Sequence, residues 1–259
     1  MRYQLSAVED YEDWFEARFE EVCNLFQGRR FLVDSSAPEH EEAKSLWKSR
    51  RRYEETLRLI LPELRDPGER WFLDVGGGQL AWLVAPLFPK RTFAADLTGI
   101  FADESSRLGV ETRVWDIAAG DAPFEPASFD IVAFTEVLEH LPPPPFPYML
   151  RVARLLKPGG LLLFSCPNLA SFAKRWKFLL FGRSPLKLGV RSYERTGTPE
   201  HIREYTVPEV RRILTACGFR IERLLAGNYG FGAWKRVTTL FARLLPTLGR
   251  TVLVRASLG

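Results

Sequence analysis

The sequence predicts an α/β protein of the doubly wound type, in which helices cover both faces of a largely parallel sheet. From residue 67 onward, short apolar runs alternate with segments of helical periodicity. These runs are apolar on both faces, as strands covered on both sides must be. The first run leads into three consecutive glycines, and an aspartate closes each of the first three runs. Such alternation indicates parallel strands joined by right-handed crossovers.

The first 66 residues differ, because apolar and aromatic residues recur there at helical spacing. The pattern covers residues 11–26 and again residues 41–61. We therefore expect a helical extension over residues 1–66, followed by one α/β domain over residues 67–259. A chain of 259 residues suits a single large domain with such additions.

Seven strands are expected. Five central ones fall at residues 71–75, 92–95, 112–115, 131–134 and 161–165, with a helix at 80–87 and a turn at 157–160. A helix near 207–217, a strand near 219–225, a helix at about 233–245 and a strand near 251–256 follow. The long excursion over residues 167–206 is expected to be a lid insertion, because connections of that length are usually functional or structured.

The bulk composition narrows the function classes. Cys23, Cys166 and Cys217 are far apart and lack ligand spacing, which predicts reduced thiols and no metal site. No apolar run is long enough for a transmembrane helix and no signal-peptide pattern is present, so we expect a cytoplasmic protein. The net charge of +4 and the lack of an Asn-Pro-Pro-Tyr motif argue against nucleic acid as a partner.

The run Asp74-Val75-Gly76-Gly77-Gly78 predicts a ligand-binding turn between a strand and a helix. Glycines permit left-handed backbone angles and let a ligand approach the main chain. The spacing Gly76-x-Gly78-x-x-Ala81 also fits a nicotinamide dinucleotide site, and a tight turn without a ligand has the same pattern. The turn alone leaves these alternatives open.

Acids at the strand ends favour one alternative. Asp96 lies 22 positions after Asp74, where a carboxylate can accept both ribose hydroxyls, and Asp116 closes the third run. The carboxyl ends of parallel strands share one rim, where such folds bind ligands. A pyrophosphate needs donors there, whereas a cationic amino group and a sulfonium suit an acid. The acids therefore favour S-adenosylmethionine over a dinucleotide.

These motifs resemble those of class I S-adenosylmethionine-dependent methyltransferases, especially the ubiquinone/menaquinone-biosynthesis type. Residues 74–78 resemble motif I, residues 129–141 the fourth-strand signature, residues 155–160 the approach to the fifth strand, and residues 201–206 the late connector. The resemblance implies a Rossmann-like sheet of seven strands with the last antiparallel. It also implies S-adenosyl-L-methionine as cofactor and S-adenosyl-L-homocysteine as product.

The resemblance also assigns cofactor-binding roles. They fall on Asp74, Gly76, Gly77, Gly78, Asp96, Leu97, Asp116, Ile117, Thr135 and Glu136. One departure is Leu80, which replaces the usual third glycine of motif I and is expected to reshape the methionine end of the pocket. It keeps a non-catalytic, cofactor-binding relative open as an alternative. A nicotinamide-dependent oxidoreductase is the other alternative. It is disfavoured because the sequence has no Tyr-x-x-x-Lys or similar hydride-transfer motif.

Methyl transfer to a hydroxyl needs a base, and we take His140 and His201 as candidates. His140 follows the fourth strand, and His201 ends the excursion that would cover the cofactor. Each also has a structural interpretation, namely a hydrogen bond that positions the backbone. Glu136 could hold the methionine moiety or an acceptor amine.

The acceptor is predicted only by class. Residues 167–206 carry eight bases and three acids, with Phe172, Trp176 and Leu179 on one helical face, and residues 233–245 repeat the pattern. These stripes pack into the core, or they form an apolar cover with a basic rim. The second alternative suits O-methylation of a small-molecule, glycan or lipid-linked acceptor, with peripheral contact to a membrane.

Replacing Asp96 by alanine should weaken the binding of S-adenosylhomocysteine by roughly 1.5–3 kcal/mol, the scale for losing charge-assisted hydrogen bonds. Titration calorimetry measures this, and NAD(H) should not bind to the unmodified chain. Unchanged affinity in the variant would remove Asp96 from the site.

Overall fold

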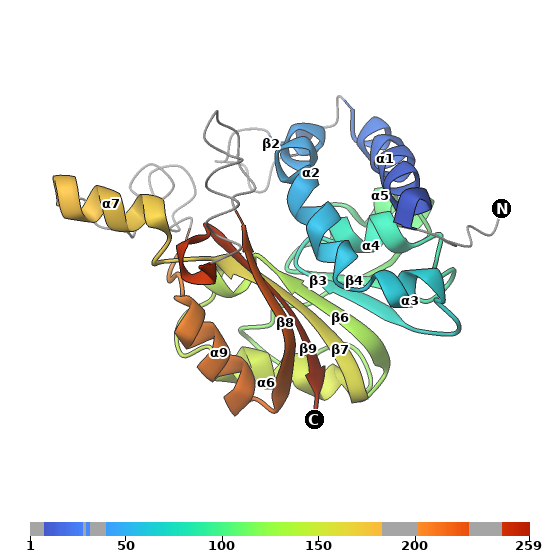
Figure 1. The fold of residues 1–259 in the computed structure, drawn as a ribbon. Helices are drawn as coiled ribbons and strands as arrows, with labels where there is room; N and C mark the ends of the chain where they lie inside the picture. Colours follow the sequence, from blue (N-terminus) through green and yellow to red (C-terminus); the bar gives the residue numbers. More distant parts are fainter. Residues whose placement is uncertain (1–7, 28–29, 32–39, 183–200, 228–244) are drawn as a thin grey trace.

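The computed structural model describes residues 8–27, 30–31, 40–182, 201–227 and 245–259. Its centre is a seven-stranded sheet in the order β5-β4-β3-β6-β7-β9-β8 (Figure 1). The strands are β3 (Phe72–Val75), β4 (Thr92–Asp96), β5 (Glu111–Val114), β6 (Phe129–Thr135), β7 (Leu156–Pro167), β8 (Phe219–Gly227) and β9 (Thr251–Leu258). Among these seven strands, β9 alone points in the opposite direction and pairs antiparallel with both β7 and β8, while the other pairs are parallel. The predicted fold class is therefore confirmed.

The strand order reverses direction at β3, which pairs with β4 on one side and with β6 on the other. The chain leaves β3 and β4 toward one edge of the sheet and continues from β6 toward the other edge. Crossovers on opposite sides of such a switch point diverge, which opens a crevice at the carboxyl ends of the strands. The predicted cofactor residues lie at or directly after the carboxyl ends of β3, β4, β5 and β6.

Helices cover both faces of the sheet (Figure 1). One face packs against α1 (Val8–Leu25), α2 (Glu42–Arg58), α3 (Leu61–Arg65) and α4 (Gln79–Val84), with α5 (Ala102–Arg107) on the same side. The other face packs against α6 (Phe146–Leu155) and α9 (Val207–Ala216). Successive strand residues alternate between the two cores, so that Phe72 belongs to the first and Leu73 to the second.

The N-terminal region is helical as predicted, but it is more divided. The second expected helix ends at Arg58 instead of Leu61, and the short α3 follows with Pro62 in its first turn. Proline lacks an N–H and clashes with the preceding turn, so it begins helices more readily than it continues them. A two-stranded pair, β1 (Arg30–Phe31) and β2 (His40–Glu41), was not predicted.

For two further segments the sequence-based expectation is not confirmed. The expected turn at residues 157–160 lies within β7, where the register with β6 shifts between the pairs Phe129–Leu156 and Ile131–Leu161. Gly159 supplies a φ of +74° for this irregularity. The helix expected at 233–245 lies almost wholly outside the described residues. Leu245 is the one residue of that range that the structure describes.

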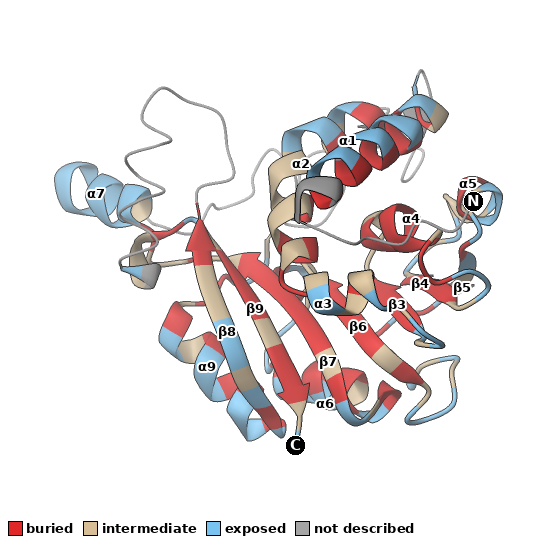
Figure 2. Cartoon of the chain, turned by 45° about the vertical axis from the view of Figure 1, so that its right-hand side comes forward, coloured by how far each residue is buried: buried red, intermediate tan, exposed pale blue. Residues whose placement is uncertain are grey.

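Helix α7 (Phe172–Phe181) projects away from the body of the molecule (Figures 1 and 2). None of its residues is buried, and Phe178, Leu179 and Phe181 are among the most exposed apolar side chains. The core-packing interpretation of this stripe therefore fails for residues 172–181. Across the described ranges, no helix combines the length and apolar character needed to cross a bilayer.

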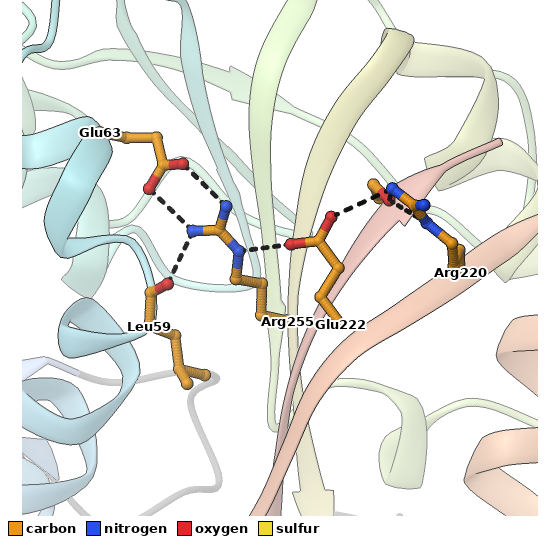
Figure 3. A network of polar contacts seen from close by, with 6 residues as sticks. Leu59, Glu63, Arg220, Glu222 and Arg255 are labelled. Carbon is orange, nitrogen blue, oxygen red and sulfur yellow. Dashed lines mark hydrogen bonds and ion pairs between the residues drawn. The ribbon is translucent and has the colours of Figure 1, made fainter.

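A polar network joins the N-terminal extension to the last two strands (Figure 3). Arg255 of β9 donates to both carboxylate oxygens of Glu63, each at 2.8 Å, and to the carbonyl oxygen of Leu59, also at 2.8 Å. Its Nε donates to Glu222 of β8 at 2.7 Å. This paired arrangement fixes the guanidinium in one geometry and positions α3 against the sheet.

Replacing Arg255 by methionine should lower the free energy of unfolding by about 1–3 kcal/mol, because Glu63 would lose its partner in a largely shielded position. Urea denaturation measures this change. The matched control is Arg154→Met, since Arg154 and Asp121 are 72% and 83% exposed and lie 3.7 Å apart. The control should change stability by less than about 0.5 kcal/mol; equal losses would show that Arg255 does not anchor α3.

Candidate active site

The glycine turn connects β3 to α4. Gly76, Gly77 and Gly78 have φ angles of +102°, +103° and +83°, which other residues rarely adopt. A Cβ at Gly76 would collide with the side chain of Val137, and one at Gly78 would lie 3.1 Å from the Cβ of Ala94. The turn therefore requires glycine for both conformation and space.

Asp74 is buried directly beneath this turn. Its Oδ2 accepts hydrogen bonds from the backbone N–H groups of Leu80 at 2.8 Å and Ala81 at 3.2 Å. These groups belong to the first turn of α4, where N–H groups lack helical partners. Burial raises the pKa of Asp74 to about 7. The carboxyl group thus closes the turn, while a direct contact with the cofactor stays a prediction.

Leu80, which departs from motif I, has its side chain in the core that α1, α2 and α4 share. Its backbone N–H reaches Asp74, so the position still takes part in shaping the turn.

The next strand ends present two more acids. Asp96 is half-buried at the end of β4, and its Oδ1 accepts from the N–H and the hydroxyl of Thr98 at 2.9 and 3.0 Å. Leu97 beside it is 64% exposed. Asp116 is exposed and accepts from the N–H of Ala118 at 2.8 Å, while Ile117 is buried. Carboxylates beside an exposed leucine suit ribose hydroxyls and an adenine ring, and these roles stay predictions.

Thr135 and Glu136 lie where β6 ends. Glu136 has a φ of +56°, which is uncommon for a residue with a side chain and is often found at functional sites. Its N–H donates to the carbonyl oxygen of Ser165 at 2.9 Å, and the Ser165 hydroxyl donates to its Oε1 at 2.9 Å. Arg52 of α2 forms an ion pair with Oε2 at 2.8 Å.

The structure brings the two candidate catalytic histidines together. The rings of His140 and His201 pack edge to face with centroids 5.0 Å apart. The carbonyl oxygen of Glu139 accepts from the N–H groups of Ile202 at 2.7 Å and Arg203 at 3.1 Å, which fixes the connector against the end of β6. Residues 61 positions apart in the chain therefore form one cluster.

The ends of the excursion are also joined. Asn168 and Tyr205 form an isolated bridge, and the N–H of Leu169 donates to the carbonyl oxygen of Tyr205 at 3.0 Å. The Asn168 amide donates to the carbonyl oxygens of Thr247 and Gly249 at 3.0 and 2.7 Å. The chain thus leaves and returns at one point, as a lid insertion would, although its closure over an acceptor stays a prediction.

Two buried glutamates lie beside the histidines. Glu204 places Oε1 3.1 Å from Nδ1 of His201 and forms an ion pair with Lys174 of α7. Glu139 places Oε1 4.0 Å from Nε2 of His140. Burial raises the pKa of Glu139 well above its usual range, and the nearby Glu136 carboxylate raises it further. Glu139, His140 and His201 offer ligand atoms that all lie within 4.8 Å of one another, so they could hold a metal ion.

A family model described as a methyltransferase domain matches residues 46–224, which include the sheet from β3 to β7 and most of β8. The chain belongs to this methyltransferase family. Its α/β domain is an S-adenosylmethionine-dependent methyltransferase domain, in agreement with the glycine turn and the acids on the rim. The nicotinamide-dependent alternative finds no support in this match.

Two curated relatives are similar to this methyltransferase. A probable S-adenosylmethionine-dependent methyltransferase of Mycolicibacterium smegmatis is 30% identical over 54% of this chain and 49% of its own length. A ubiquinone biosynthesis O-methyltransferase of Thiobacillus denitrificans is 30% identical over 67% of this chain and 75% of its own length. The chain thus spans about half of the first relative and three quarters of the second.

Solved structures show the same fold. A Mesorhizobium loti S-adenosylmethionine-dependent methyltransferase superposes with a TM-score of 0.56 at 20% identity, covering 78% of this chain and 96% of that one. The N-methyltransferase NodS of Bradyrhizobium japonicum, solved with S-adenosylhomocysteine, has a TM-score of 0.53 at 19% identity, covering 94% and 97%.

Sequence reasoning missed several residues of this site. Arg52 lies in the N-terminal extension and Lys174 in α7, and no local pattern distinguishes either from other surface bases. Glu139 stood in the fourth-strand signature three positions after Glu136, so that spacing together with the adjacent His140 could have revealed it. Glu204 was three positions after His201.

The pKa of Asp74 predicts how stability varies with pH. Because the folded pKa of about 7 exceeds the unfolded value of about 3.8, the folded state binds the proton more tightly. The free energy of unfolding should therefore fall as pH rises from about 4 to 7, by up to about 1.4 kcal/mol per pH unit from this group. Urea titrations of Asp74→Asn should show a flatter profile. Asp103→Asn in α5 retains Asp74 and serves as control; identical slopes in all three proteins would contradict the assignment.

Proposed function

We propose that this domain methylates a hydroxyl oxygen of a small-molecule, glycan or lipid-linked acceptor. The observation that carries the proposal is the pairing of His201 with the buried Glu204, beside His140 and Glu139 at the end of β6. Methyl transfer to oxygen requires a base that removes the proton of the acceptor hydroxyl. Histidine and glutamate side chains, which make up this cluster, can act as that base.

The reaction itself requires little covalent chemistry from the protein. The acceptor oxygen attacks the methyl carbon, the bond from that carbon to the sulfonium sulfur breaks, and the hydroxyl proton leaves the acceptor. Alignment of the oxygen with the methyl group supplies much of the rate enhancement. The glycine turn and the rim acids would hold the cofactor, and the His140–His201 cluster would meet the acceptor.

Glu204 specifies the state of His201. In the tautomer that donates from Nδ1 to Glu204, the Nε2 nitrogen carries a lone pair that can accept a proton. The carboxylate also stabilises the imidazolium that would result, as in other His–carboxylate pairs. His201 is therefore our candidate for the base, and His140 positions it through the edge-to-face contact.

The composition of α7, which belongs to the predicted cover, supports the proposed class of acceptor. Helix α7 presents exposed aromatic and aliphatic side chains together with three bases and no acid. Lys174 reaches Glu204, so α7 is linked directly to the partner of His201. An apolar acceptor with an anionic group, or one held at a membrane surface, would match this composition. The similarity to a ubiquinone biosynthesis O-methyltransferase supports oxygen as the acceptor atom.

The test is transfer of labelled methyl groups from S-adenosylmethionine to phenolic, glycan and lipid-linked hydroxyl compounds, with the product identified by mass spectrometry. His201→Ala should lower kcat by about 10²–10⁴-fold and leave the affinity for S-adenosylhomocysteine unchanged. His40→Ala, in β2, is the matched control and should retain activity.

Three outcomes would contradict this proposal. Methylation at nitrogen would exclude O-methylation, and full activity in His201→Ala would remove His201 from the chemistry. Cofactor binding without transfer to any acceptor would favour the non-catalytic alternative.

A further inference from the structure

We propose that Glu139, His140 and His201 bind a divalent metal ion, to which the acceptor hydroxyl adds as a further ligand. The inference deepens the proposed O-methylation and depends on it for the role of the acceptor. Its starting point is that these residues offer one carboxylate oxygen and two imidazole nitrogens within 4.8 Å of one another.

The second observation is an orphaned oxygen. Glu139 is 1% exposed, and its Oε2 has no hydrogen-bond partner among the described residues. A buried carboxylate oxygen without a partner is costly, and native proteins rarely leave one unsatisfied. Arg52 and Lys174 are close enough for their charges to lower the pKa of Glu139, but they form their ion pairs with Glu136 and Glu204. A cation between Glu139 and the histidines would satisfy this oxygen.

The third observation concerns the orientation of His201. Histidines that bind metals generally donate their other ring N–H to a carboxylate or carbonyl oxygen, which sets the tautomer. Glu204 accepts such a contact from Nδ1 of His201 at 3.1 Å and is itself buried. In this tautomer Nε2 of His201 carries the lone pair and is therefore the ligand atom.

The geometry requires only small movements. In tetrahedral coordination, ligand atoms at about 2.1 Å from a shared ion lie about 3.4 Å apart, so separations of up to 4.8 Å must close by at most about 1.4 Å. The side chain of His140 is 47% exposed, so a change in its ring orientation would alter its edge-to-face contact with His201 without requiring a buried side chain to become exposed. Glu139 is held by its backbone contacts to the connector, which also carries His201.

The ligand set indicates the kind of ion. One carboxylate with two imidazoles suits Mn²⁺, Fe²⁺ or Zn²⁺, and three protein ligands leave positions open for an acceptor oxygen and water. The ion would lower the pKa of a bound hydroxyl, so that its proton passes to solvent near neutral pH. The oxygen then takes the methyl group while the carbon–sulfur bond breaks, leaving S-adenosylhomocysteine. In this arrangement Nε2 of His201 binds the ion and is not the base.

The experiment uses the full chain, freed of metals with EDTA and dialysed, and titrates Mn²⁺ by electron paramagnetic resonance with S-adenosylhomocysteine present. We expect binding at micromolar concentrations that weakens at least tenfold in Glu139→Gln, His140→Ala and His201→Ala. Glu222→Gln, in the Arg255 network, is the matched control and should bind Mn²⁺ normally. Calorimetry with S-adenosylhomocysteine on each variant verifies that it is folded.

The outcomes separate this site from the proposed function. No Mn²⁺ binding by the unmodified chain, or equal binding by the three variants, would overturn the metal site. If O-methyl transfer then persists in EDTA, the proposed function stands with His201 as base. Specific Mn²⁺ binding without any O-methyl product would support the site and reject the proposed function. Transfer that EDTA abolishes and Mn²⁺ restores would support both.

Discussion

The buried carboxyl group of Asp74 holds together the part of the structure on which the others depend. It lies at the end of β3 and accepts the N–H groups of Leu80 and Ala81, so three glycines with left-handed angles are closed into one rigid turn. Those N–H groups would otherwise face the interior without partners. The position of α4, and of the rim that the cofactor is predicted to occupy, follows from these contacts.

Helix α4 in turn anchors the N-terminal extension. Arg18 of α1 donates to the carbonyl oxygen of Trp82 at 3.1 Å from Nε, and Phe26 stacks on the Trp82 ring with centroids 4.5 Å apart. Arg52 of α2 reaches the rim itself through Glu136. On the opposite side, the Glu139 carbonyl oxygen holds the connector that carries His201 and Glu204. The cluster of charged residues and histidines around His140 and His201 is thus assembled from α2, α7, the end of β6 and the connector before α9.

The sequence predictions were accurate for features that neighbouring residues determine and less accurate for features that depend on contacts between distant segments. Strands β3, β4 and β6 were predicted closely because an apolar run covered on both faces has few alternatives. The glycine turn was predicted because Gly76 and Gly78 serve a local backbone requirement. The prediction that no metal site exists was based on the lack of Cys-x-x-Cys and Cys/His ligand spacing; it did not consider Glu139 beside His140, and it stays untested. Residues 157–160 were predicted as a turn between a helix and the fifth strand, but β7 already begins at Leu156 through its pairing with β6 and includes them.

The sequence by itself determined the α/β class, the seven strands, the glycine turn and, through motif resemblance, the antiparallel last strand and the family. These properties depend on hydrophobic periodicity and backbone conformation, which neighbouring residues specify. Only the tertiary structure decided that His140 meets His201, that Glu204 orients His201, and that Glu139 is buried with one oxygen that has no partner in the described part of the chain. Those facts depend on contacts between segments up to about sixty residues apart. Such contacts arise only when the connector packs against the end of β6, because no local pattern determines which buried polar atoms find partners.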